Sequence, residues 1–172
     1  PFMSALVIAL SIAGFVVVAC MRVSDPLLPL FAVDFGVCVG QAGSVVTAYA
    51  VAYGLFLLAY GPLGERYGKL KVIAVTLTAA SVCVTACAFA DSLPMLATLR
   101  FLTGVTSAAT VPLAIAWIGD NVPFEHRQKS IARYMSGIIF GQMLGSALGG
   151  VLSDRFGWRA IFLVNVPLSL LA

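Results

Sequence analysis

Apolar residues dominate this chain in long blocks that contain no charged residue. Asp, Glu, Lys, Arg and His are absent from six segments, residues 1–21, 35–64, 72–90, 101–119, 134–153 and 160–172. A bilayer core about 30 Å thick needs about 20 apolar residues for each spanning helix, and all the segments except the last reach about that length. The pattern therefore predicts an all-α integral membrane protein, with helices at about 4–31, 41–63, 71–90, 93–119, 131–152 and 160–172.

The composition supports a membrane protein and argues against several other classes. Hydrophobic residues make up 61% of the chain and the mean hydropathy is +1.05, whereas soluble domains are roughly 45–50% apolar. The net charge of +3 does not indicate nucleic-acid binding, because most basic residues lie in short loops between apolar segments. The four cysteines, Cys20, Cys38, Cys83 and Cys87, show no C-x-x-C spacing. We expect no metal site and no cofactor.

The distribution of basic residues over the loops predicts the orientation of the chain. The loops after the second and fourth predicted helices carry six of them, Arg66, Lys69, Lys71, Arg127, Lys129 and Arg133. The loops on the other side carry two, Arg155 and Arg159. By the positive-inside rule, the first set of loops is cytoplasmic, and the N-terminus lies on the same side.

Two loop sequences indicate an internal repeat. "GPLGERYGKLK" (61–71) and "GVLSDRFGWRA" (150–160) share the pattern Gly, any residue, Leu, small, acidic, Arg, aromatic, Gly, at an offset of 89 residues. Three predicted helices lie between the copies, so the copies face opposite sides of the membrane, as an inverted repeat of three helices plus three requires. Chance similarity between two short loops is the alternative.

These stretches resemble the major facilitator superfamily of transporters. Segment 61–71 is similar to its signature loop between helices 2 and 3, although the usual Asp is Glu65 here. "RFLTGVTSA" (100–108) resembles the helix 4 motif, and "GQMLGSALGG" (141–150) resembles the helix 5 motif of drug/proton antiporters, with Ser146 at the Pro position. "SDPLLPLFAVDFG" (24–36) is similar to the end of helix 1 in bacterial multidrug exporters, with Asp25 and Pro29 at matching positions.

The resemblance implies a fold of twelve helices in two halves of six. Residues 1–172 are then the N-terminal bundle, its sixth helix is cut short, and the C-terminal half is absent. It also implies a protein of the inner (cytoplasmic) membrane that works by alternating access and couples proton movement to efflux of a small amphipathic solute or drug. The expected partners are that solute, protons, the lipid bilayer and the missing half.

Two other functions stay open at this point. A proton-coupled uptake symporter has the same fold. An integral membrane enzyme would need clustered His, Asp or Ser at one membrane depth, whereas the single histidine, His126, lies in a predicted loop beside Glu125 and Arg127. We therefore expect no enzyme activity.

Arg100 is the first candidate for the transport site. It interrupts an uncharged stretch from Ser92 to Gly119, and an Arg at the middle of a membrane costs about 2.5–3.5 kcal/mol on insertion scales. Thr103, Ser107 and Thr110 follow at i+3, i+7 and i+10, which predicts one polar stripe facing a wet cavity. Arg100 would bind anionic substrate groups or act on a nearby carboxylate. The alternative is an Arg whose side chain extends towards the headgroups.

Asp25 is the candidate for proton coupling. It lies one helical turn from Arg22, and Pro26 and Pro29 free backbone carbonyls beside it. A carboxylate in this setting can take up and release a proton as the cavity changes faces. A static Asp25–Arg22 ion pair at the membrane boundary is the alternative.

Two glycine-rich motifs predict close helix contacts. On helix 5, glycines recur every four residues and give a smooth face for another helix, on which bundles could also rock; with the adjoining glycine they are Gly137, Gly141, Gly145, Gly149 and Gly150. The loop motif at 61–71 predicts a tight turn whose charges pair with the opposite half and form a cytoplasmic gate. Its residues are Gly61, Gly64, Glu65, Arg66, Gly68 and Lys69. A turn that only fixes the topology is the alternative.

Overall fold

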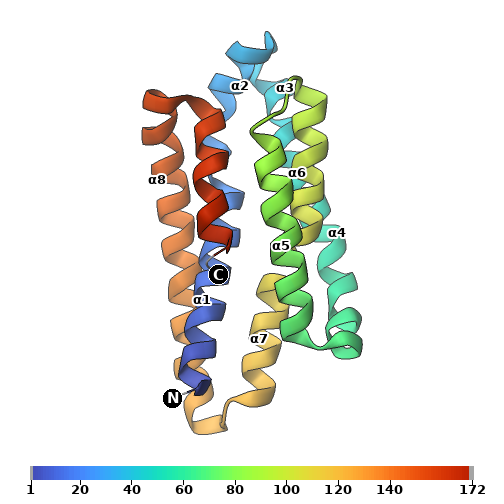
Figure 1. The fold of residues 1–172 in the computed structure, drawn as a ribbon, viewed down its shortest axis with the longest axis vertical. Coiled ribbons are helices and arrows are strands. Elements are labelled where there is room, and N and C mark those ends of the chain that lie inside the picture. Colours follow the sequence, from blue (N-terminus) through green and yellow to red (C-terminus); the bar gives the residue numbers. More distant parts are fainter. Residues whose placement is uncertain (1, 171–172) are drawn as a thin grey trace.

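The computed structural model describes residues 2–170, and these residues form helices joined by short turns (Figure 1). The helices are α1 (Phe2–Arg22), the 3₁₀ helix η1 (Asp25–Leu27), α2 (Leu28–Phe35), α3 (Val39–Ala42), α4 (Ser44–Tyr67), α5 (Lys69–Cys87), α6 (Leu93–Ser107), α7 (Thr110–Asn121) and α8 (Phe124–Leu170). The long helices lie side by side along one axis. α2 and α3 lie at one end, called here the α2 end, and the α4–α5 and α7–α8 turns lie at the other, called the basic end.

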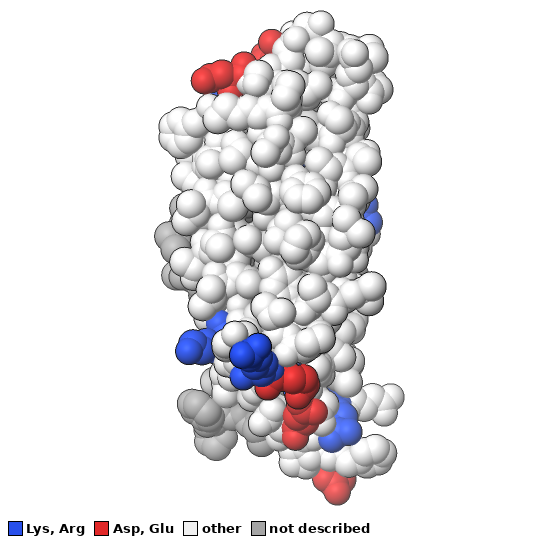
Figure 2. Space-filling model, turned by 90° about the vertical axis from the view of Figure 1, so that its right-hand side faces the viewer, with Lys and Arg blue, Asp and Glu red and all other residues white. Residues whose placement is uncertain are grey.

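The helices are long and apolar enough to cross a membrane. Five candidate spans are present in the described residues, Ala5–Phe35, Val39–Tyr67, Lys69–Cys87, Leu93–Asn121 and Phe124–Ser153. The remainder of α8, up to Leu170, forms a sixth helix. Residues 171 and 172 of the predicted sixth helix lie outside the described residues. On the face drawn in Figure 2, charged side chains gather near the two ends, and the broad band between them is almost entirely uncharged.

Two predicted helices are interrupted. The helix predicted at 4–31 ends as α1 at Arg22, passes through η1, and resumes as α2 from Leu28 to Phe35. The helix predicted at 93–119 ends as α6 at Ser107 and resumes as α7 at Thr110. Proline explains both breaks, because Pro26 and Pro112 have no N–H to donate to the carbonyl four residues earlier.

Two predicted loops are single-residue turns. α4 continues to Tyr67 and α5 begins at Lys69, so most of the segment 61–71 is helical. α8 likewise runs from Phe124 to Leu170 with one non-helical residue, Gly157. Gly68 has φ 90° and ψ 126°, and Gly157 has φ 75° and ψ 163°. Only glycine adopts such angles readily, so one turn serves both copies of the repeat.

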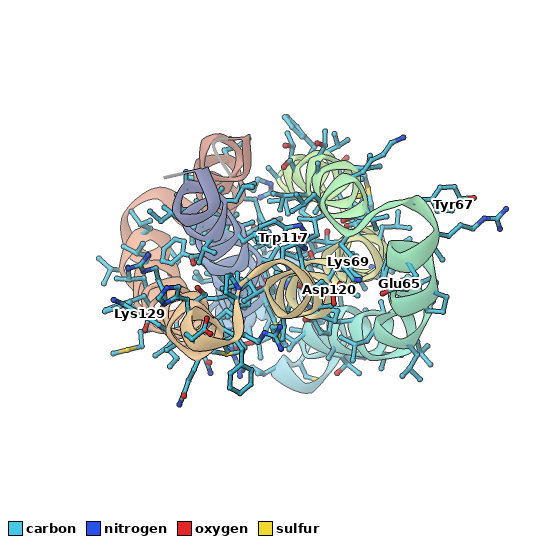
Figure 3. The ribbon with its side chains drawn as sticks, turned by 90° about the horizontal axis from the view of Figure 1, so that it is seen from below. Glu65, Tyr67, Lys69, Trp117, Asp120 and Lys129 are labelled. Atoms are coloured by element: carbon cyan, nitrogen blue, oxygen red, sulfur yellow. The ribbon has the colours of Figure 1, made fainter. Side chains whose placement is uncertain are left out.

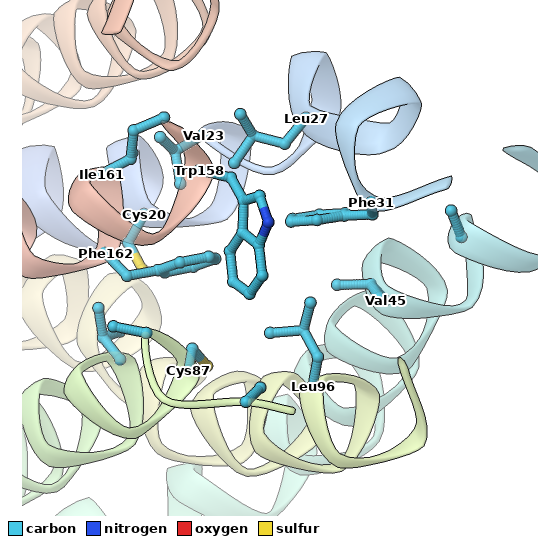
Figure 4. Packing of buried hydrophobic residues seen from close by; sticks show 14 of the residues in the cluster. Cys20, Val23, Leu27, Phe31, Val45, Cys87, Leu96, Trp158, Ile161 and Phe162 are labelled. Atoms are coloured by element: carbon cyan, nitrogen blue, oxygen red, sulfur yellow. The ribbon is translucent and has the colours of Figure 1, made fainter. Parts of the chain in front are cut away.

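Two main apolar clusters fill the bundle. The cluster at the α2 end surrounds Trp158 and includes Phe31, Leu96 and Phe162 (Figure 4). The cluster towards the basic end includes Leu113, Trp117 and Tyr134. Between these clusters lie the buried polar residues of α6 and α7 that form the candidate site.

Candidate functional site

Arg100 lies in the interior of the bundle and is fully buried. Its Nη1 donates a hydrogen bond to the carbonyl of Cys20 at 3.1 Å, and its Nη2 donates to the carbonyl of Met21 at 3.3 Å. The guanidinium also lies 4.5 Å from the centre of the Tyr49 ring. The predicted alternative, a side chain that extends towards the headgroups, is therefore wrong for Arg100.

The contacts of Arg100 follow from the break in the first helix. Cys20 and Met21 lie in the last turn of α1, where backbone carbonyls have no partner within the helix and the helix dipole is negative. A cation at this position stabilises the end of α1. The buried charge of Arg100 is only partly compensated. Its Nε has no hydrogen-bond partner, and no carboxylate of the described residues lies within ion-pair distance.

The polar stripe on α6 and α7 continues from Arg100 inside the bundle. Thr103, Ser107 and Thr110 are all buried. Thr103 donates to the Leu99 carbonyl at 2.8 Å, whereas the Thr110 hydroxyl has no partner. A water-sized cavity of about 20 Å³ lies beside Ser107. The wet cavity expected beside the stripe stays a prediction.

Asp25 is paired as the sequence suggests. It lies in η1, and its Oδ2 is 3.3 Å from Nη1 of Arg22 at the end of α1. Both side chains are partly exposed, at 37% for Asp25 and 39% for Arg22. The structure thus places Asp25 and Arg100 at the same helix break, and each faces a different partner.

The charged motif at the basic end forms an ion triplet (Figure 3). Lys69 Nζ lies 2.6 Å from Glu65 Oε1 and 2.6 Å from Asp120 Oδ2. Glu65 comes from the last turn of α4, Lys69 from the first residue of α5 and Asp120 from the end of α7. The expected pairing was with the opposite half of the protein, but Lys69 has its partners within this half.

The remaining residues of this motif have separate environments. The Arg66 guanidinium lies 5.4 Å from the centre of the Tyr67 ring. Gly64 packs against Leu113 of α7, where a Cβ would collide with the leucine side chain. Gly61 has open space around it, and Gly68 forms the turn. The close approach of α7 requires a residue without a Cβ at Gly64, and the backbone conformation requires glycine at Gly68. No contact among the described residues requires a glycine at Gly61.

The glycines of the predicted helix 5 lie on α8, and they pack directly on the backbone of α1 and of Val23, which follows it. A Cβ on Gly137, Gly145 or Gly149 would lie 2.8, 2.6 or 2.7 Å from the carbonyl oxygens of Ser11, Ala19 and Val23, in that order. Gly141 meets the Phe15 carbonyl in the same way, and Gly150 approaches Pro26. The predicted close approach is present, since each step of four residues along α8 matches one along α1.

Three further residues take part in these contacts that the sequence motifs did not indicate. Tyr49 lies beneath Arg100, Asp120 pairs with Lys69, and Asp34 accepts hydrogen bonds from Trp158 at 2.7 Å and Arg159 at 3.1 Å. Asp34 and Asp120 each lie at the end of an apolar segment, where charges are rare, and that position was the available signal. Among the described residues, no group of three His, Cys, Asp or Glu side chains is arranged to hold a metal ion.

Comparisons with known proteins identify the family of the chain. A family model described as Major Facilitator Superfamily matches residues 10–172. The multidrug export protein EmrB of Haemophilus influenzae is 31% identical over 165 residues, 96% of this chain and 32% of that protein. A gallate transporter of Pseudomonas putida is 31% identical over 147 residues, 84% of this chain and 33% of that protein. The chain spans about a third of the length of these curated relatives.

Solved structures with the same fold are membrane transporters. A bacterial homolog of the human lysosomal transporter Spinster, inward-facing and unoccupied, has a TM-score of 0.82 and 18% identity, over 99% of this chain and 42% of that one. The POT family transporter PepTSo has a TM-score of 0.74 and 19% identity, over 94% of this chain and 35% of that one. The predicted fold class, six helices that form half of a twelve-helix fold, is confirmed by these likenesses.

Proposed function

Because the chain belongs to the major facilitator superfamily, we propose that the full-length protein is a secondary active transporter that works by alternating access and couples proton movement to efflux of a small amphipathic solute. The chain supplies one six-helix half, and the other half completes the cavity. The similarity to the multidrug export protein EmrB supports efflux. We place the protein in the inner membrane, with the N-terminus and the basic end in the cytoplasm, because the basic residues concentrate in the loops at that end.

The observation that carries this proposal is the buried Arg100 beside the break of the first helix. A buried cation without a carboxylate partner is costly in a membrane interior, and residues of this kind mark substrate or ion pathways. Two carbonyls and the Tyr49 ring hold the guanidinium in place, and its Nε is left without an acceptor. An anionic group of the substrate, or of the other half, would complete its coordination.

Asp25 is proposed as the proton-coupling carboxylate. It is partly exposed, it lies at the same break, and Arg22 is the only described cation within ion-pair distance. Protonation would release Arg22, and deprotonation would restore the pair, so the charge at the break changes with the state of Asp25. A change of that kind can bias the two orientations of the transporter.

Uptake of an organic anion is the second candidate function. Two observations favour it, the identity of 31% with a gallate transporter and the absence of a described carboxylate beside the buried Arg100. In that case Arg100 would recognise the substrate carboxylate directly. The direction of transport distinguishes the two functions.

The test is transport by the full-length protein in energised vesicles, with cationic and neutral dyes and an aromatic carboxylate as substrates. We expect dye efflux that a proton uncoupler abolishes and that Asp25→Asn removes. Asp91→Asn is the matched control, because it removes an exposed carboxylate at the α2 end, away from the break. Efflux that ignores both the uncoupler and Asp25→Asn would contradict the proton mechanism, and carboxylate uptake alone would favour the second function.

A further inference from the structure

Trp158 and Arg159 follow the Gly157 turn and converge on one carboxylate. The Trp158 Nε1 donates to Oδ2 of Asp34 at 2.7 Å, and Arg159 Nη1 donates to the same oxygen at 3.1 Å. Arg159 Nη2 also donates to the carbonyl of Ala90 at 3.2 Å, and its guanidinium lies 4.3 Å from the centre of the Trp158 ring. Arg159 thus connects α8 with the ends of α2 and α5.

The contacts with α2 lie on one face of that helix. Phe31, Asp34 and Phe35 are spaced i, i+3 and i+4, which places them side by side. The Phe31 and Phe35 ring centres lie 5.1 and 5.8 Å from that of Trp158. Figure 4 shows the Trp158 ring between Phe31 and Phe162. Trp158 therefore holds α2 by packing and by a hydrogen bond.

α2 depends on such contacts for its position. It has eight residues, too few for a stable isolated helix, and the 3₁₀ turn η1 joins it to α1 in place of a continuous helix. Asp25 is the first residue of η1, so the orientation of α2 also sets the orientation of the turn that carries Asp25.

We propose that Trp158 and Arg159 are positioning residues for the transport site. Acting through Asp34, they fix α2 and hold the break of the first helix in the geometry that pairs Asp25 with Arg22 and presents the end of α1 to Arg100. This inference rests on the proposed function of Asp25. It assigns to the loop copy at 150–160 a role that the charged motif at 61–71 does not have, because the charged motif lies at the other end of the bundle.

The test measures the motion of α2 in the full-length protein. A nitroxide label is placed at Val33→Cys, which is 81% exposed, after the accessible native cysteines, Cys38 among them, are replaced by Ser. Asp34→Ala removes the acceptor of both hydrogen bonds, and Trp158→Phe keeps an aromatic ring but removes the N–H donor together with part of the packed ring. Asp91→Ala is the control, a carboxylate lost from the same end without described contacts to α2.

We expect faster label motion in Asp34→Ala and in Trp158→Phe, and no change in Asp91→Ala. The double variant that combines Asp34→Ala with Trp158→Phe should show label motion close to that of Asp34→Ala alone, because both changes remove the same hydrogen bond. The pH profile of transport should also shift in Asp34→Ala and in Trp158→Phe. A loss of core packing alone would leave that profile unchanged. Asp34 is partly exposed, so we expect Asp34→Ala to fold. It therefore still tests the proposal if Trp158→Phe does not fold.

Unchanged label motion in folded Asp34→Ala protein would overturn the proposal. Faster motion with an unchanged pH profile would also overturn it, provided that Asp25→Asn abolishes coupling in the same assay. If Asp25→Asn transports normally, the proposed function of Asp25 is wrong, and the spectra alone then decide whether Trp158 and Arg159 fix α2. The two failures are therefore distinguishable.

Discussion

The turns at Gly68 and Gly157 have the same backbone design and different side-chain chemistry. Both are single glycines with positive φ, 89 residues apart. The residue after each glycine, Lys69 or Trp158, contacts an aspartate near the end of another helix. At Gly68 the contact is an ion triplet in which Glu65 and Asp120 are largely exposed. At Gly157 the contact includes Trp158, which is buried in an apolar cluster.

The difference shows that an inverted repeat preserves geometry more readily than chemistry. An exposed ion pair is weak and is screened by salt, so it suits a contact that forms and breaks. A buried tryptophan with its N–H satisfied contributes packing and a hydrogen bond together, so it suits a contact that persists. We expect the α2 end of this half to be the more rigid one.

Removal of the Trp158 ring should have the largest effect. Trp158→Ala leaves a cavity among Phe31, Phe35 and Phe162 and frees the Asp34 carboxylate. A buried Trp→Ala change costs about 3–5 kcal/mol. The measurement is the temperature at which the full-length protein in detergent ceases to be monodisperse. A melting temperature close to that of the unchanged protein would contradict the view that the α2 end is the rigid one.

The two turn glycines should respond alike when each is replaced by alanine. A Cβ would contact nothing within 4 Å at either position, so only the backbone conformation opposes the change. Strain in such sparsely populated regions is worth of the order of 1–3 kcal/mol. Thermal melting of Gly68→Ala and Gly157→Ala should therefore give similar decreases. A large decrease for only one of them would show that the two turns do not share one backbone design.

The ion triplet should give the smallest effect and the greatest dependence on salt. Asp120→Asn removes one of the two partners of Lys69, while Glu65 remains. We expect a small decrease in melting temperature at low ionic strength that disappears at high salt, because exposed pairs are screened. Asp34→Ala, measured in parallel, removes the acceptor of the Trp158 hydrogen bond and should lose stability at both salt concentrations. An equal salt dependence of the two variants would contradict the comparison.

The sequence was sufficient for the fold because uncharged segments of membrane length determine the helices directly. It also predicted that another helix packs closely on the glycine face of residues 137–150, since glycines every four residues give a smooth helix surface; the structure identifies that helix as α1. The prediction failed where one residue changes the path of the chain. Pro26 and Pro112 break helices that hydropathy describes as continuous, and a single glycine is sufficient where loops were expected.

The residues proposed for the candidate site stand out in the sequence, but most of their contacts do not. Arg100 and Asp25 stand out because charges are rare in such a chain, and Arg22 was the expected partner of Asp25. The partners of Arg100 are backbone carbonyls and an aromatic ring, which carry no distinctive sequence signal. The partner of Lys69 was expected in the other half of the protein. Pairing within this half depends on which helix ends become neighbours, and the sequence does not show that. Asp120 is brought there by the fold.

The α1–α8 contact also limits how the two helices can slide. Each glycine from Gly137 to Gly149 accommodates one carbonyl of α1, and the next equivalent carbonyl lies four residues away. A sliding step that restores the fit is therefore about 6 Å long, at 1.5 Å of rise per residue, and any smaller step drives a carbonyl against a bulkier side chain. We therefore expect a small displacement of α1 to carry α8 with it, so that the two helices move as one rigid body.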